Sequence, residues 1–276
     1  MPLDLESFPM RLFRATQERA WLPSQIDFSQ ERNHWMSLNE DQNELLARLI
    51  AGFRVGERGV THELAPLQAV LRDEGRLDEE MYVTAQMFEE ARHVEFFETW
   101  ITETLPGVWG KDIPYPQLRG DMFSSRLPEV MRALHTDPSP AAQMKAIVLY
   151  HLYIEGVGAE SSYPMYFEIF DKTGLFPALE EGISLIRRDE ARHIAFGTYL
   201  LQRLLQENPD LDELFQAEME EMRPFAEAGA EQTFEPFEGR EAPFGLQHEK
   251  FRRLYQENFE QQKRNVYDRK LLAAVV

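Results

Sequence analysis

The tetrapeptide Glu-Ala-Arg-His occupies residues 90–93 and occurs again at residues 190–193. Residues three apart project from the same face of an α-helix, so in each copy the Glu and the His can bind one metal ion together. A single Glu-x-x-His is weak evidence, because it also occurs by chance. Two copies in one chain predict a paired site to which two helices each contribute a Glu and a His.

Both motifs lie within apolar helical stripes, and so do two single glutamates. Glu57 lies in a stripe over residues 46–64, and Glu155 lies in one over residues 148–159. A charged carboxylate is costly in an apolar core unless a cation balances it. Two divalent ions would balance four carboxylates, and carboxylate and imidazole ligands suit iron and manganese. The predicted metal ligands are Glu57, Glu90, His93, Glu155, Glu190 and His193.

The arrangement of one Glu per helix alternating with Glu-x-x-His helices is the pattern of ferritin-like di-iron and di-manganese bundles. Helix formers dominate the chain, and alternating strand patterns are scarce. We therefore predict an all-α, ferritin-like four-helix bundle with additional helices, as a single domain over residues 1–276. Its N-terminal extension covers residues 1–36, and a helical and loop extension covers residues 207–276.

Capping and breaking residues predict where the helices begin and end. Ser37 with Glu40 would open the first, with a kink before Pro66, and Ser139 with Pro140 would open the third. The predicted long helices span about residues 38–72, 78–105, 140–173 and 177–206, with weaker ones over 210–228 and 245–265. The stretches 106–127 and 229–243 are predicted to be connections, because they contain several Gly and Pro.

Four residues near the predicted ligands are charged but are not predicted to bind metal. Glu63, Glu89 and Arg92 fall off the apolar stripes, so we expect them to be exposed to solvent. Asp189 precedes Glu190, and it is either an exposed helical residue or a hydrogen-bond acceptor for the outer nitrogen of a ligand His. We favour the second role for Asp189.

Composition excludes several classes of function. Asp and Glu number 48 against 29 Lys and Arg, a net charge of −19 that would repel nucleic acid. The chain has no Cys, which excludes disulfides and thiolate sites and fits the cytoplasm. We see neither a signal peptide nor an apolar run long enough to span a bilayer, so we do not expect an integral membrane protein.

The order Glu, Glu-x-x-His, Glu, Glu-x-x-His resembles the ribonucleotide reductase small-subunit superfamily from about Trp21 to Leu201. The stretch AWLPSQIDFSQERNHW, residues 20–35, looks like the segment before the first ligand helix there. The resemblance implies an electron relay through Trp21, although an aromatic packing role explains Trp21 equally well. Subunits that use a tyrosyl radical have a Tyr one turn after the first ligand His, where this chain has Phe97.

A closer resemblance is to the ribonucleotide-reductase-like ligand-binding oxidases. The stretch GERGVT, residues 56–61, matches the motif that holds their first ligand, and DEGRLDEEMYVTAQMFEEARH and HTDPSPAAQ are also similar. This resemblance implies an ether bond between the Cβ of Val60 and the oxygen of Tyr150. It also implies a manganese–iron cofactor, with Fe/Fe as the alternative, a long-chain fatty acid as ligand, and a homodimer.

The spacing of Tyr150 and Glu155 alone does not favour that ether bond. Residues five apart are about 140° apart around an ideal α-helix, so the two side chains would share a face only across a π-bulge. Val60 lies three residues from Glu57 and can lie near the metals. Without the resemblance, both residues are better explained as core packing.

These observations predict an oxidoreductase that activates dioxygen for two-electron oxidation of a C–H bond. The alternative is a ribonucleotide reductase small subunit without the tyrosyl radical, which would need a large-subunit partner. A ferritin-like metal store would need a cage-forming oligomer, which this chain does not suggest. A purely structural metal bundle ranks last, because four carboxylates around open metal positions make a poor structural site.

Overall fold

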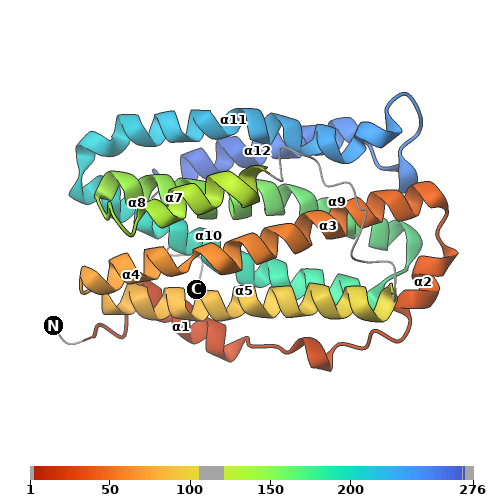
Figure 1. Ribbon diagram of the computed structural model, residues 1–276, viewed down its shortest axis with the longest axis horizontal. Helices are drawn as coiled ribbons and strands as arrows, with labels where there is room; N and C mark the ends of the chain where they lie inside the picture. The colour runs from red at the N-terminus through yellow and green to blue at the C-terminus, as the bar shows by residue number, and fades with distance from the viewer. Residues whose placement is uncertain (1–2, 106–120, 269, 271–276) are drawn as a thin grey trace.

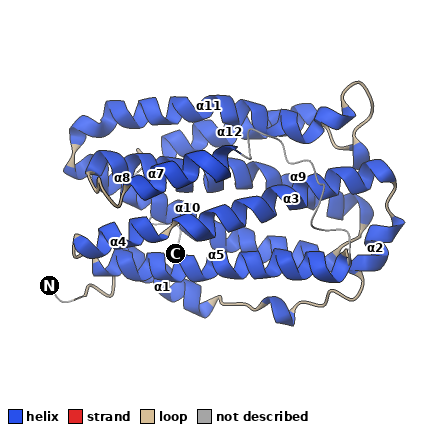
Figure 2. Ribbon diagram, in the orientation of Figure 1, coloured by secondary structure: helices blue, strands red, loops and turns tan. Residues whose placement is uncertain are grey.

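The computed structural model describes residues 3–105, 121–268 and 270, and every regular element within these ranges is a helix (Figure 2). Four long helical stretches run side by side along the molecule (Figure 1). They are α3 (Glu40–Glu63), α5 (Leu77–Thr104), the continuous α8 (Pro140–Ile147), η3 (Val148–Ala159) and α9 (Glu160–Thr173), and α10 (Pro177–Glu207). The predicted ferritin-like four-helix bundle is thereby confirmed.

The N-cap of the first long helix lies two residues after the predicted one. Asn39 is the N-cap: its Oδ1 accepts from the backbone N–H of Gln42 at 2.9 Å, and the Gln42 side chain accepts from the Asn39 N–H at 3.0 Å. Ser37 instead ends the short helix α2 (Glu31–Ser37). Before Pro66 the structure has a break where the sequence predicted only a kink: α3 ends at Glu63, and α4 (Ala65–Asp73) follows.

The third and fourth bundle helices begin as the sequence predicts. The Ser139 hydroxyl accepts from the backbone N–H of Ala142 at 3.3 Å, and Pro140 occupies the first helical position. Gly174 ends α9 in the left-handed conformation, with φ 64°, and α10 opens at Pro177. These caps fix where the antiparallel pair turns.

The N-terminal extension is helical, which the sequence analysis did not predict. It contains α1 (Phe8–Glu18), which packs along α5, and α2. From α2, the buried Glu31 accepts from the backbone N–H of Ala178 at 3.1 Å and from the Trp100 indole at 2.5 Å. A carboxylate is stabilised at a helix N-terminus, so Glu31 caps α10 from another part of the chain.

The C-terminal extension contains two helices that pair with each other and pack against η3. They are α11 (Asp212–Phe234) and α12 (His248–Asn265). The predicted loop over residues 229–243 is therefore wrong at its beginning: α11 continues to Phe234, and Gly229 and Ala230 are buried. Figure 1 shows α11 and α12 lying together along one side of the bundle.

The predicted connection over residues 106–127 lies partly outside the described residues, which resume at Asp121. There the π-helical η2 (Met122–Arg126) leads into α7 (Leu127–Ala133). Short 3-10 turns complete the described chain: η1 (Pro23–Gln25), η4 (Pro209–Leu211), η5 (Glu235–Phe237) and η6 (Pro243–Gly245). No described helix is both long and apolar enough to cross a membrane.

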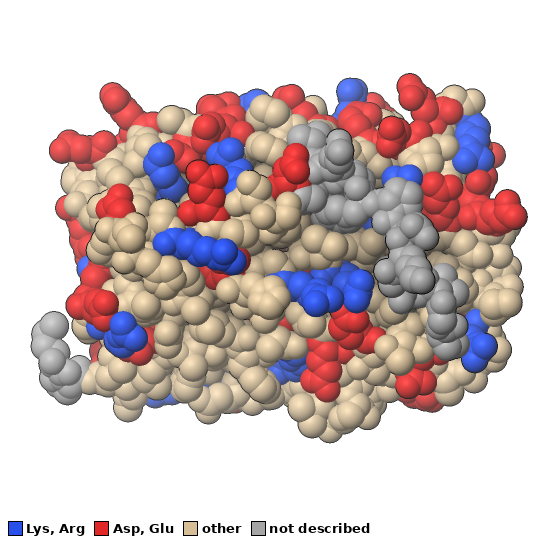
Figure 3. Space-filling model, viewed as in Figure 1, with Lys and Arg blue, Asp and Glu red and all other residues tan. Residues whose placement is uncertain are grey.

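The acidic side chains divide between the surface and the core. On the face in Figure 3, acidic groups gather over α11 and at both ends, which accounts for much of the charge. The described core nevertheless buries a further set of carboxylates: Glu31, Glu57, Glu63, Glu79, Glu89, Glu90, Glu155, Asp189 and Glu190. A buried carboxylate needs a partner, so each member of this set marks a contact that the fold depends on.

Candidate metal centre

The six predicted ligands meet in the middle of the bundle. Glu57 comes from α3, Glu90 and His93 from α5, Glu155 from η3, and Glu190 and His193 from α10, and all are buried. Their oxygen and nitrogen atoms form two groups, within each of which the atoms lie no more than 4.8 Å apart. The groups are Glu57, Glu90, His93 and Glu190, and Glu90, Glu155, Glu190 and His193.

Glu90 and Glu190 belong to both groups, so they lie between two neighbouring cation positions. His93 Nδ1 lies 3.3 Å from Glu57 Oε2 and 3.3 Å from Glu190 Oε1. His193 Nδ1 lies 3.2 Å from Glu90 Oε1 and 3.6 Å from Glu155 Oε1. Each imidazole thus defines one position, and the two shared carboxylates can bridge them.

Each of these six side chains has one buried atom without a hydrogen-bond partner. These atoms are Glu57 Oε2, Glu90 Oε2, His93 Nδ1, Glu155 Oε2, Glu190 Oε2 and His193 Nδ1. Leaving a buried polar atom unpaired is costly, and six of them in one place indicate a missing common partner. Oxygen and imidazole donors around two adjacent positions fit two divalent metal ions of the iron and manganese kind.

Burial changes the pKa values of two of the carboxyl groups. Burial raises the pKa of Glu57 to about 8, although the neighbouring His93 opposes the shift. Burial and the nearby Glu190 also raise the pKa of Glu155 well above its usual range. Both shifts show that uncompensated negative charge is unfavourable at these two positions. A bound cation would balance that charge.

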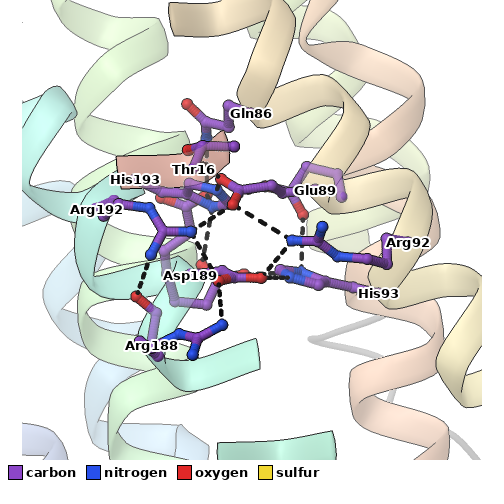
Figure 4. Close-up of polar contacts among 12 residues, drawn as sticks. Thr16, Gln86, Glu89, Arg92, His93, Arg188, Asp189, Arg192 and His193 are labelled. Atoms are coloured by element: carbon purple, nitrogen blue, oxygen red, sulfur yellow. Dashed lines mark hydrogen bonds and ion pairs between the residues drawn. The ribbon is translucent and has the colours of Figure 1, made fainter. Parts of the chain in front are cut away.

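The outer nitrogen of each imidazole is held by a carboxylate from the facing helix. His93 Nε2 lies 3.3 Å from Asp189 Oδ2, and His193 Nε2 lies 3.1 Å from Glu89 Oε2 (Figure 4). Each carboxylate accepts a hydrogen bond from an Nε2–H, which leaves the lone pair on Nδ1 directed at the centre. This is the usual way in which outer carboxylates orient metal-binding imidazoles.

Glu89 and Arg92 are buried, so the expectation that they face solvent is wrong. The two residues form a buried group of two positive and two negative charges with Asp189 and Arg192 (Figure 4). The Arg92 guanidinium donates to Asp189 at 2.7 Å, and Arg192 donates to Asp189 at 2.7 Å and also to Glu89. Thr16 of α1 donates to Glu89 at 3.2 Å.

The sequence contained a signal for the role of Glu89. Glu89 precedes Glu90 in the first motif as Asp189 precedes Glu190 in the second. Extending the repeat by one acidic residue predicts a reciprocal arrangement, in which each motif supplies the outer carboxylate for the other motif's His. The expectation for Glu63 is wrong too, because Glu63 is buried and accepts from Arg132 Nε at 2.8 Å.

Trp21 reaches the same network from the N-terminal segment. Its indole N–H donates to Asp189 Oδ2 at 2.7 Å. Its ring stacks on the His93 imidazole at a centroid distance of 6.3 Å and an interplanar angle of 18°. The contact chain therefore runs from Trp21 through Asp189 to His93, and the side chain is also well packed, with 6% of its surface exposed.

Val60 and Tyr150 both lie beside the cluster. Val60 is 4% exposed on α3, and the buried Tyr150 hydroxyl donates to Glu90 Oε1 at 3.1 Å. Tyr150 and Glu155 both fall within η3, which is π-helical over Val148–Ala159. In a π-helix, hydrogen bonds join residues five apart, so Tyr150 and Glu155 share a face. The π-bulge that the spacing requires is therefore present.

A pocket opens beside the cluster. Glu57, Glu155, Glu190 and Val60 lie on its wall. The remaining wall is mainly apolar or aromatic and comes from α3, η2, η3, α9, α11 and α12, with Phe53, Met122, Phe123, Ile154, Ala159 and Phe225 among its residues. A mainly apolar lining with a few polar groups is typical of small-molecule sites.

The fold and the site together define a class: a four-helix bundle whose core presents four carboxylates and two imidazoles to two adjacent metal positions. The family model described as ribonucleotide reductase, small chain, matches residues 10–228. The chain belongs to this family.

Solved structures give a closer comparison. R2-like ligand-binding oxidase with aerobically reconstituted Mn/Fe cofactor (long soak) is 31% identical, with a TM-score of 0.91, over 95% of this chain and 94% of that chain. A variant of the oxidase with aerobically reconstituted Fe/Fe cofactor is 30% identical, with a TM-score of 0.90, over 95% and 94%. The predicted resemblance to ligand-binding oxidases is thereby confirmed.

Proposed function

We propose that this chain is an oxidase that activates dioxygen at a pair of metal ions, manganese with iron or two irons. The six residues that would hold the ions are Glu57, Glu90, His93, Glu155, Glu190 and His193. The observation that carries the proposal is the set of six unpaired buried atoms, which form two overlapping groups. The cofactors named for the similar oxidases, Mn/Fe and Fe/Fe, support the choice of metals.

When bound, such a reduced metal pair would supply two electrons to dioxygen and the oxidising power to break an unactivated C–H bond. The protein's part is to orient the reacting groups and to exclude water. Asp189 and Glu89 keep both Nδ1 atoms directed at the centre. The buried aromatic residues Phe53 and Phe97 pack against each other at 5.7 Å beside the cluster and help to keep water out.

The internal target of the oxidation would be Val60. In this step the Cβ–H bond of Val60 and the O–H bond of Tyr150 break, and a Cβ–O bond forms between them. Two electrons and two protons pass to dioxygen, and two further electrons with two protons complete its reduction to water. Glu90 Oε1 accepts a hydrogen bond from the Tyr150 hydroxyl at 3.1 Å, so it is placed to take the phenolic proton.

The names of the similar structures are consistent with this pair. One is a valine variant and another is a tyrosine variant, and the two substituted positions are as far apart in that chain as Val60 and Tyr150 are in this one.

The external ligand would be a long-chain fatty acid. Its carboxylate would reach the metals where Glu57, Glu155 and Glu190 line the pocket, and its tail would occupy the apolar remainder. A ligand of this kind matches a pocket that is charged at one end and lined mainly by apolar residues elsewhere. It would also bring an apolar chain close to the oxidising centre.

A ribonucleotide reductase small subunit is the second candidate, and the contact chain from Trp21 through Asp189 to His93 is compatible with it. Such a subunit passes electrons between the metals and a partner. The buried Phe97 cannot form a tyrosyl radical, and it packs against Phe53 and Phe96 as a core residue. Trp21 can serve either candidate as an electron relay, so it does not decide between them.

The test is peptide mass mapping after anaerobic loading with Mn(II) and Fe(II), before and after exposure to air. We expect the peptides containing Val60 and Tyr150 to become joined, with the loss of two hydrogens, only after air is admitted. Tyr150→Phe is the control, because it keeps the ring and removes the oxygen that would form the ether. Wild-type protein that holds two metals and consumes dioxygen, yet leaves these peptides separate, would refute the cross-link and favour the reductase candidate.

A further inference from the structure

The C-terminal helix α12 carries a buried amide that contacts the π-helix of the metal centre. The buried residues of α12 are Phe251, Tyr255, Phe259 and Gln262, so Gln262 is the amide on an otherwise aromatic buried face. Only 7% of its surface is exposed. An amide at a core position is costly unless it is hydrogen-bonded, so its partner is informative.

That partner is the backbone of η3, next to a predicted metal ligand. Gln262 Nε2 donates to the Gly156 carbonyl at 3.2 Å, and Gly156 follows Glu155 directly. The missing side chain of Gly156 provides the room: a Cβ there would lie 2.7 Å from Gln262 Cδ. The amide and the glycine therefore fit each other, and neither can be enlarged without displacing the other.

The π-helical register is what places Tyr150 and Glu155 at the same centre. In an α-helix the two residues would diverge by about 140°, whereas here Tyr150 donates to Glu90 and Glu155 lies 3.6 Å from His193. Rewinding the segment into an α-helix would rotate Gly156 relative to Tyr150, so the two residues could not both keep their present contacts. The bond from Gln262 to Gly156 and the bond from Tyr150 to Glu90 are thus made together in the π-helical register.

We propose that Gln262 is a positioning residue: through its bond to Gly156 it holds η3 in the π-helical register that brings Tyr150 and Glu155 to the metal centre. Gln262 lies beyond residue 228, where the match to the family model ends. The consequence for metal binding and cross-linking rests on the proposed function. The contact with η3 does not, so the two can be tested separately.

The test replaces Gln262 by Met in the full chain, which keeps the volume and removes the donor. The matched control is Asn258→Leu, which removes another α12 amide that donates to Ser161 in α9, at 3.0 Å. Hydrogen–deuterium exchange of metal-free protein is followed over residues 148–159. We expect Gln262→Met to speed exchange there by about tenfold, as for the loss of one buried hydrogen bond, and Asn258→Leu to leave it near the wild-type rate.

The second readout is metal content after anaerobic loading. We expect Gln262→Met to lose up to one metal equivalent and Asn258→Leu to keep the wild-type content. Wild-type exchange and metal content in Gln262→Met would overturn the proposal, as would equal changes in both variants. A wild-type protein that never cross-links would refute the proposed oxidation, while the exchange comparison would still decide the role of Gln262.

Gly156→Ala tests the contact from its other side. The added methyl group would press on Gln262 Cδ, so we expect faster exchange over η3 in this variant also. Gln262→Ala removes the obstructing amide, so the double variant should be no worse than Gln262→Ala alone. Fully additive effects would show that the two residues act independently and would contradict the proposal.

Discussion

At the scale of single residues, the decisive feature is that each imidazole is oriented by an acidic residue of the other motif. Asp189 holds His93, and Glu89 holds His193. Arg92 and Arg192 bind both carboxylates, so the group is electrically balanced within the core. A buried charge that loses its partner is strongly destabilising, which makes this network sensitive to any change of charge.

Replacing Glu89 by Gln should weaken metal binding as well as the fold. The amide keeps the shape of the side chain but removes the negative charge that supports His193, and it leaves two arginines facing Asp189 alone. Loss of such an outer carboxylate typically lowers metal affinity by about 10–100-fold. Competition titration against a chelator measures the change.

Glu98→Gln is the control for this variant, since Glu98 pairs with Arg54 and Arg58 at the surface. We expect it to bind metal as the wild type does. Equal affinities in Glu89→Gln and Glu98→Gln would mean that the outer carboxylate does not support His193.

The sequence predicted the inner residues of the site better than these outer ones. The helical period identifies the face of α5 that points into the bundle, and Glu90 and His93 fall on it. Glu89 and Arg92 point elsewhere, and they are buried because α1 covers that side of α5, with Thr16 bonded to Glu89. A periodicity analysis that did not predict α1 had no reason to bury a second face.

At the scale of the elements, α5 and α10 are joined near one end by a buried ion pair. Glu79 of α5 lies 3.2 Å from Arg203 of α10, and it also accepts from Tyr199 at 3.3 Å. Burial raises the pKa of Glu79 to about 7, although Arg203 and Arg76 act in the opposite direction. The carboxylate that links the two helices is therefore held in its charged form at some cost.

This pKa predicts how stability depends on pH. The pKa of Glu79 in the folded protein, about 7, lies above its ordinary value of 4.5. The folded state therefore binds more protons than the unfolded state between these values, and the contribution of Glu79 to stability falls as pH rises from about 4.5 to about 7. Through Glu79, the free energy of unfolding changes by at most about 1.4 kcal/mol per pH unit.

Urea unfolding of metal-free wild type and Glu79→Gln between pH 5 and pH 8 isolates this contribution. The other acidic groups are common to both proteins, so their effects cancel in the difference. We expect the variant to gain stability relative to the wild type as pH rises through the window. A difference that stays constant with pH would show that Glu79 titrates near its ordinary value.

Helix ends followed from the sequence where a local cap decides them, as at Ser139. They failed where a distant contact decides them. Gly229 suggested a loop, yet it lies inside α11, because the Tyr255 ring packs so closely that a Cβ would lie 2.3 Å from its Cε1. Such a glycine makes room for a neighbouring helix, and local sequence does not distinguish it from a turn glycine.

At the scale of the whole molecule, the bundle brings four carboxyl groups together in its core, and some of their oxygen atoms have no hydrogen-bond partner among the described residues. Glu57, Glu90, Glu155 and Glu190 come from four different elements, and each has one oxygen without a hydrogen-bond partner. Without metal, charged carboxylates at this point oppose the packing of the four elements, because burial raises the pKa of Glu57 and of Glu155. A pair of metal ions would turn the same contacts into attraction, so binding and folding should be coupled.

Metal loading should therefore raise the temperature of unfolding. A ligand that binds only the folded state at about 100 times its Kd adds about 2.7 kcal/mol, which corresponds to about 5 °C or more for a chain of this size. Calorimetry with Mn(II) and Fe(II) under anaerobic conditions measures the increase, and a chelator should reverse it. Glu155→Gln sharpens the test because it removes a carboxyl group whose charged form is disfavoured by burial. It should be at least as stable as the wild type without metal and should gain less when metal is added, so the order of the two proteins would reverse on loading. If both proteins gained equally, Glu155 would not hold the metal, and its burial among Glu190, Glu90 and His193 would need another explanation.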